Sequence, residues 1–242
     1  MEYTKVGLSH KDFFHLVLYH NLSKKPQTAA IIYQSIKEDF PFKVHSRSYF
    51  YNTVKNRINE GYLSSSQEGK AHILSLTPKG KEHYGHYKSH YQDKFERVKE
   101  VIDRFVFDLT GSGPNPPVIS PLPEGYRRFF SKLVSVKDLV RYVALQQMFR
   151  QQEVIMSDVG EILERKYGWV ASSSYLYDVA HEMAESGLVY GEWKGERRSK
   201  RYYRLTDEGV HHFKQIADSA ASTAQNIQHF LEHILILFNS HL

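Results

Sequence analysis

The chain has 242 residues, of which 41% are hydrophobic and 14% aromatic, and its formal net charge is +5. This charge is a mild bias towards polyanionic partners. The absence of cysteine excludes disulfides and thiolate metal sites. The most apolar run, residues 234–238, is far shorter than the roughly 20 residues of a membrane span, and no secretion leader opens the chain. We therefore expect a soluble, cytoplasmic protein without a membrane partner.

One sequence pattern occurs twice. Residues 11–14 (KDFF) align with residues 137–140 (KDLV), and the alignment continues without a gap to Gly61 and Gly187. Beyond these glycines the second copy is three residues longer, at a place where a hairpin tip is expected. Insertions concentrate in exposed loops because nothing packs against them. The repeat predicts two copies of one fold in a single chain.

The predicted domains are residues 1–110 and residues 126–242. Between them, residues 111–125 contain five prolines and three glycines. This composition forbids a continuous helix and predicts a semi-rigid linker. Each domain would contain about 100 residues, which is an ordinary size for one hydrophobic core.

Each copy is expected to begin with two helices. Ser9 and Ser135 are each followed three residues later by an aspartate, a pattern that satisfies the free amides at the start of a helix. Apolar residues follow both serines at helical spacing. A second, short helix is expected over residues 28–36 in the first copy and over residues 154–163 in the second.

The third helix is expected over residues 46–59, and its counterpart precedes Gly187. Gly61 and Gly187 would end these helices, because glycine adopts the left-handed conformation of a C-terminal cap at little cost. An apolar stripe marks the predicted buried side of each helix. The stripe comprises Tyr51, Val54, Ile58 and Tyr62 in the first copy, and Tyr177, Ala180, Ala184 and Leu188 in the second.

Two strand-like runs follow each third helix. They are residues 62–63 with 73–76, and residues 188–190 with 201–205, and a polar tip that contains glycine joins each pair. Three helices followed by a hairpin are the order of a winged helix-turn-helix. In that fold the third helix enters the major groove of DNA, and the hairpin, called the wing, lies along the backbone.

A long helix is expected after each wing. Its apolar residues are separated by threes and fours, which predicts a seam for helix–helix packing. Where the first seam has Tyr91 and Phe95, the second has Ala220 and Ala224, and we expect large residues to face small ones. The predicted fold class is mainly α with small β-hairpins: tandem winged helix-turn-helix domains, each followed by a long packing helix. The seam residues are Tyr84, Tyr87, Tyr91, Phe95, Val98, Ile102, Phe105 and Leu109, matched by Phe213, Ile216, Ala220, Ala224, Ile227, Leu231, Ile234 and Phe238.

Several segments also match a known family. The most specific is the wing strand at residues 201–209 (RYYRLTDEG), echoed at residues 73–80, and Tyr51 and Tyr177 near the start of the third helices fit as well. The sequence resembles the PadR family of bacterial transcriptional regulators, although that family usually has a proline after this tyrosine. The resemblance implies a DNA-binding winged helix whose long helix forms a dimer interface. It also implies transcriptional repression that, in some members, responds to small aromatic compounds.

Side chains near the start of a third helix are placed to read bases, and cations on a wing are placed to contact phosphates. The second wing is the more basic, and we expect it to dominate the salt dependence of binding. A charged hairpin tip can also be only a solvated surface, and Tyr51 and Tyr177 suit core or phosphate contacts better than base reading. The candidate DNA-binding residues are His45, Arg47, Ser48, Tyr49, Tyr51, Asn52, Lys55 and Lys70 in the first copy, and Ser172, Ser173, Ser174, Tyr175, Tyr177, Lys194, Arg197, Arg198, Lys200 and Arg201 in the second.

The leading functional hypothesis is a sequence-specific DNA-binding transcriptional regulator, most simply a repressor, that reads two half-sites of an imperfect palindrome. Its partners would be double-stranded DNA, with a small-molecule inducer and a second copy of the chain as further candidates. Two alternatives stay open: a protein-interaction or ligand-sensing scaffold, favoured by Asp178, and a plasmid or phage DNA-organising protein.

The sequence contains no recognisable catalytic motif. A Gly-rich phosphate loop, a nucleophile elbow and a paired-acid motif are all absent, so we expect neither an enzyme nor a cofactor. His83, His86 and His90 share one helix face at a spacing that suits a metal. The second copy has no equivalent set, and we expect no metal site.

Overall fold

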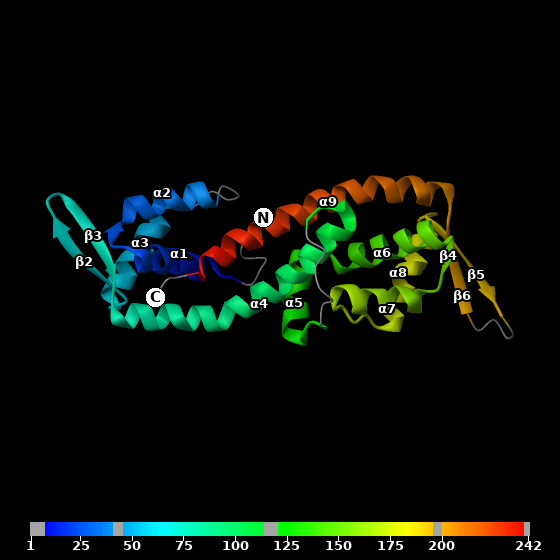
Figure 1. The fold of residues 1–242 in the computed structure, drawn as a ribbon, viewed down its shortest axis with the longest axis horizontal. Helices are drawn as coiled ribbons and strands as arrows, with labels where there is room; N and C mark the ends of the chain where they lie inside the picture. Colours follow the sequence, from blue (N-terminus) through cyan, green and yellow to red (C-terminus); the bar gives the residue numbers. More distant parts are fainter. Residues whose placement is uncertain (1–7, 41–45, 114–120, 196–199, 240–242) are drawn as a thin grey trace. The chain divides into compact units, whose positions relative to one another are not determined.

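The computed structural model describes residues 8–40, 46–113, 121–195 and 200–239 (Figure 1). The chain divides into two compact units. Unit 1 consists of Met1–Lys99 together with His229–Leu242, and unit 2 consists of Glu100–Gln228. Within the described ranges, no helix combines the length and the apolarity that a bilayer crossing requires.

Unit 1 contains three helices and a three-stranded sheet before the first long helix. The sheet has the order β1-β3-β2, and both pairings are antiparallel. The elements are α1 (His10–Lys24), β1 (Gln27–Thr28), α2 (Ala29–Asp39), α3 (Arg47–Asn59), β2 (Leu63–Glu68), β3 (Ala71–Leu76) and the first part of α4 (Pro78–Thr110). As predicted, Ser9 caps α1: its hydroxyl accepts from the Asp12 amide (3.0 Å) and donates to the Asp12 carboxylate (2.6 Å).

After the end of α4 and one additional helix, α5 (Glu124–Leu133), unit 2 repeats this order of elements. Its sheet has the order β4-β6-β5, again antiparallel throughout. The repeated elements are α6 (Val136–Gln151), β4 (Glu153–Val154), α7 (Met156–Tyr167), α8 (Ser173–Glu185), β5 (Val189–Lys194), β6 (Lys200–Leu205) and most of α9 (Asp207–Ile236). The two-residue strands β1 and β4 were not predicted, because so short a run has no periodicity to recognise.

The third helices begin and end close to where the sequence predicts, and Val54 and Ala180 of the predicted stripes are buried, but the other stripe residues within the helices lie one position away from the buried side. The buried side of α3 comprises Phe50, Thr53, Val54 and Arg57, and that of α8 comprises Leu176, Val179, Ala180 and Met183. Tyr177 is 42% exposed. The prediction failed because it chose Tyr51 and Tyr177 over the neighbouring Phe50 and Leu176, which are buried. It also passed over two polar residues, Thr53 and Arg57, that the core of unit 1 encloses.

The repeated motif Leu-Thr-x-x-Gly has a structural cause in both units. Thr77 donates to the Gly61 carbonyl (2.8 Å) and accepts from the Gly80 amide (3.0 Å), which ties the end of the third helix to the start of the long helix. Thr206 makes the same two contacts in unit 2. A Cβ on Gly80 would lie 2.1 Å from the Tyr62 carbonyl oxygen, so only glycine permits this close approach.

The long helices contribute to both units, and most residues of their predicted seams are buried. The others are half-buried: Tyr87, Tyr91, Leu109, Phe213, Ile216 and Ala220. In unit 1 the Phe95 ring lies 5.8 Å from that of Phe238, and Lys99 forms an ion pair with Glu232 (3.5 Å). These pairs run in opposite directions along the two helices. The expectation that Tyr91 and Phe95 face small residues is therefore wrong, since it assumed pairing at matched depth.

Candidate nucleic-acid interface and ligand cavity

The first turns of α3 present polar side chains to solvent. Arg47, Ser48, Asn52 and Lys55 are exposed, and Tyr49 is 40% exposed. Ser46 caps the helix by accepting from the Tyr49 amide (3.3 Å), which fixes where these side chains begin. Tyr51 is half-buried and lies 5.5 Å from the Arg47 guanidinium. His45 lies outside the described residues.

The same stretch of α8 is polar but not basic. Ser172 caps the helix by accepting from the Tyr175 amide (3.3 Å), and Ser173 and Ser174 are exposed beside it. The Tyr177 side chain lies on the exposed side of the helix. The candidate DNA-binding residues of α8 therefore lie together in its first turns. The side chains that they expose to solvent there carry hydroxyl groups and no cations.

The wing of unit 1 has little charge. Lys70 is exposed at the turn between β2 and β3. Gln67 and His72 are paired across the two strands near the end of this hairpin. This wing is therefore the less basic of the two, as the sequence indicates.

The wing of unit 2 holds part of its charge in an internal ion cluster. The Glu153 carboxylate of β4 accepts from Lys194 (2.7 Å) and from Arg204 (2.6 Å). These hydrogen bonds lower the pKa of Glu153 below its ordinary value. Lys194, a predicted phosphate contact, is therefore partly neutralised by Glu153, whereas Lys200 is exposed. Arg197 and Arg198 lie outside the described residues.

Arg201 has a different environment on the opposite face of this wing. Its guanidinium carbon lies 5.8 Å from the centre of the Trp193 ring and 5.2 Å from that of Tyr203. Trp193 is 51% exposed on this face, whereas Tyr190, which is 48% exposed, pairs with Arg204 on the face of the Glu153 cluster. Sequence reasoning considered only the charged residues of this wing as DNA contacts and did not single out Trp193. A signal was available, since Trp193 falls beside the polar tip of the expected hairpin, opposite Arg201 in the strand pairing.

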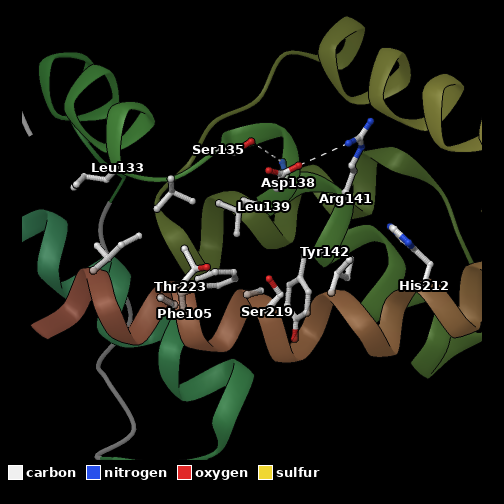
Figure 2. A pocket seen from close by; sticks show the side chains of 15 residues that line it. Phe105, Leu133, Ser135, Asp138, Leu139, Arg141, Tyr142, His212, Ser219 and Thr223 are labelled. Carbon is white, nitrogen blue, oxygen red and sulfur yellow. Dashed lines mark hydrogen bonds and ion pairs between the residues drawn. The ribbon is translucent and has the colours of Figure 1, made fainter. Parts of the chain in front are cut away.

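Unit 2 also contains a cavity of about 440 Å³, which lies within the size range of small-molecule sites (Figure 2). Its walls come from α6, from α9, from Phe105 of α4, and from Leu133 at the end of α5 with the two residues that follow it. Apolar side chains make up much of the lining, including Leu139, Tyr142, Ile216 and Ile227. Figure 2 shows the polar groups of Ser135, Asp138 and Arg141 together along one side.

The corresponding region of unit 1 is filled by tyrosines. Tyr87 donates to the Asp12 carboxylate (2.6 Å), and Tyr91 lies 3.4 Å from the other oxygen of that carboxylate. Since Tyr87 donates to Asp12, its oxygen can accept from the His15 ring (2.9 Å). In the repeat alignment these tyrosines correspond to Ile216 and Ala220, while Asp12 corresponds to Asp138. Smaller residues in α9 thus account for the cavity, and the carboxylate at its edge is retained.

Refilling the cavity tests this account of its origin. We expect Ala220→Tyr to raise the free energy of unfolding of unit 2 by about 1 kcal/mol, because it fills empty space and can donate to Asp138. Thermal denaturation of the full chain measures the change. Ala221→Tyr, on the neighbouring position outside the lining, is the matched control and should give no gain. A loss of stability with Ala220→Tyr would mean that the space is already filled.

In the described part of the chain, no three metal-ligating side chains come together. Of the three histidines with metal-ligand spacing, His83 contacts the Tyr19 hydroxyl (3.0 Å) and stacks on the Tyr62 ring (4.5 Å). Its role in unit 1 is therefore packing.

Each unit thus has the helix and strand order of a winged helix, with a polar third-helix start beside a hairpin. Residues 147–215, from the end of α6 into α9, match the Transcriptional regulator PadR-like family. A solved structure, the crystal structure of Bacillus subtilis PadR in complex with operator DNA, is 14% identical in sequence, with 94% of this chain and 98% of that chain covered and a TM-score of 0.28. No match was found among curated proteins.

Proposed function

We propose that the chain is a DNA-binding transcriptional regulator that places two winged helices on one operator. The observation that carries this proposal is the match of residues 147–215 to a family of transcriptional regulators, in a unit whose third helix starts with exposed polar residues. The repeated element order supports a second winged helix in unit 1. The fused copies, with domain bounds of 1–110 and 126–242 about the linker, would then correspond to the two subunits of a dimer.

The two third helices would read different half-sites. Arg47, Asn52 and Lys55 give α3 two cations and an amide, which suit guanine and adenine edges respectively. The start of α8 offers hydroxyls and Asp178, which a phosphate would repel. The operator is therefore proposed to be an imperfect palindrome, and binding there to repress transcription.

Selection of duplexes from a random pool by the full chain tests the proposal. An enriched motif with two unequal halves is the expected result. Recovery of no motif would favour a protein-interaction or ligand-sensing scaffold. Cooperative coating of many repeated sites would favour a DNA-organising protein instead.

Replacement of Asn52 distinguishes base-specific contacts from sequence-independent attraction to the DNA phosphates. We expect Asn52→Ala to relax the preference in one half-site only, at a cost of about 1–3 kcal/mol for the selected sequence. Competition binding with half-site variants measures the change. Asn59→Ala, at an exposed position at the far end of α3, is the control and should leave the preference unchanged. Equal loss on every sequence would contradict a reading role for Asn52.

The unit 2 cavity is the proposed site of a small-molecule inducer. Its apolar walls suit a small, partly aromatic molecule, and Asp138 suits a hydrogen-bond donor on that molecule. Because Tyr87 and Tyr91 occupy the corresponding place in unit 1, one molecule per chain would bind. A compound that releases the chain from its selected duplex, but fails to release the Ala220→Tyr variant, would identify such an inducer.

A further inference from the structure

We propose that Trp193 and Arg201 act as one unit that enters the minor groove of DNA and gives the wing of unit 2, alone of the two wings, a preference for A·T-rich sequence. This inference rests on the proposed DNA-binding function and adds a second, distinct reading element to it. It concerns the face of the wing opposite the Glu153 cluster.

The register of the hairpin places the two side chains on one face. Trp193 pairs with Arg201, and Gly191 pairs with Tyr203. Side chains of directly paired residues share a face, as do residues two apart on a strand. Tyr203 is 1% exposed, so this face turns towards the helices of unit 2 at its base. Trp193 lies on the same face further along, where it is uncovered.

The Arg201 side chain is held in place before any DNA binds. It lies between the Trp193 and Tyr203 rings and crosses over Gly191, where an added Cβ would lie only 2.6 Å from its Nε. Glycine at this position therefore makes room for the guanidinium. A side chain that is already ordered loses less conformational entropy when it binds.

The charge of Arg201 is available for a ligand. Among the described residues, no carboxylate pairs with it, and its buried Nε has no hydrogen-bond partner. Lys194 and Arg204 on the other face both contact Glu153 instead. The aromatic face thus presents a guanidinium that no carboxylate among the described residues neutralises.

This combination suits a minor groove beside the major groove that α8 would occupy. The helix α8 packs directly against β5. Narrow minor grooves of A·T-rich DNA have an enhanced negative potential that attracts arginine. Apolar side chains on minor-groove proteins contact the groove walls or wedge between base steps, a role that the exposed indole of Trp193 can fill.

Unit 1 lacks every part of this arrangement. Gln67 and His72 stand at the positions of Trp193 and Arg201, and Ser65 stands at that of Gly191. None of these three side chains supplies a permanent cation or a large aromatic surface. The preference should therefore be confined to the DNA that flanks one half-site.

Tryptophan fluorescence tests the contact directly. The chain has two tryptophans, and Trp169, which packs on Phe130 (5.8 Å), can be replaced by phenylalanine to leave Trp193 as the reporter. The probe is a duplex selected from a random pool by the unmodified chain. We expect the Trp193 emission to change when this duplex saturates the Trp169→Phe chain. Unchanged emission on a bound duplex would overturn the inference while leaving the proposed function intact.

Base substitution in the flank separates groove reading from phosphate attraction. An I·C pair lacks the amino group that G·C places in the minor groove, so its minor groove resembles that of A·T. We expect replacement of flanking A·T by G·C to weaken binding roughly tenfold, and replacement by I·C to leave it nearly unchanged. Equal losses with G·C and I·C would overturn minor-groove reading.

Exchange of residues between the wings provides matched variants. Trp193→Gln with Arg201→His installs the unit 1 residues and should abolish the roughly tenfold flank preference. Gln67→Ala is the control and should leave the preference unchanged. The reverse set, Ser65→Gly, Gln67→Trp and His72→Arg, should create an A·T preference beside the other half-site.

If Trp193→Gln with Arg201→His weakens binding equally on all flanking sequences, Trp193 and Arg201 contact only phosphates and the inference is wrong. Failure of the unmodified chain to bind any duplex would instead contradict the proposed function.

Discussion

A chain that ends at Gln228 is expected to lose the folded structure of unit 1 while unit 2 stays folded. Residues 229–238 supply five buried side chains to unit 1: Phe230, Leu231, Ile234, Leu237 and Phe238. Burial of each contributes about 1.5–3 kcal/mol. Their sum is comparable with the roughly 5–15 kcal/mol that stabilises a whole domain, so α1 to α3 should not remain folded without them.

Amide hydrogen exchange, read peptide by peptide, measures this effect. Protection should disappear from α1, α2 and α3 in the truncated chain and persist in α6, α7 and α8. A polar anchor disappears as well, because Tyr84 donates to the Leu237 carbonyl. A chain that ends at Phe238 keeps all five side chains and is the control. Normal protection of α1 in the shorter chain would contradict the assignment of the C-terminal segment to unit 1.

Acid is expected to unfold unit 1 before unit 2. His15 and His20 are buried in α1, and burial is the main cause that lowers the pKa of His15 to about 3 and that of His20 to about 4. In the unfolded chain both titrate near 6.5. The unfolded state therefore binds more protons below about pH 6.5, and the free energy of unfolding falls from there towards about pH 3–4.

Each of these histidines can remove up to a few kcal/mol across that window. Unit 2 has Arg141 and Gln146 at the matching positions and lacks this source of acid sensitivity. Hydrogen exchange at pH 7.5 and pH 4.5 should show a selective loss of protection in unit 1. His20→Gln, which installs the residue found at position 146, should remove part of the pH dependence. An equal acid response in both units would count against buried neutral histidines as the cause.

Local signals in the sequence predicted the elements that begin and end at recognisable residues. The serine caps of α1 and α6 and the glycines at positions 61 and 187 placed the helix boundaries to within a few residues. Such residues predict helix boundaries well because one residue type is enough to favour a cap or a left-handed turn. The stripe on α3 failed for the opposite reason, since burial of Arg57 depends on the Tyr19 and Tyr62 side chains that come from elsewhere in unit 1.

In the candidate sites, too, features set by local sequence were predicted and features that depend on distant contacts were not. Exposure of Arg47, Asn52 and Lys55 followed from their place at the start of a predicted helix. The Glu153 cluster could not be predicted, because it depends on strand pairing between β4 and β6. The cavity was missed because Ala220 and Ala224 were expected to receive large residues from the first seam, whereas Tyr91 turns to Asp12 within unit 1.

The number of half-sites covered by one chain is the most direct test of the account. Hydroxyl-radical footprinting on the selected duplex, at one chain per duplex confirmed by mass, resolves this number. We predict two protected segments with centres about 10 base pairs apart, as two winged helices in neighbouring major grooves would give. A single protected segment under a single chain would contradict the account.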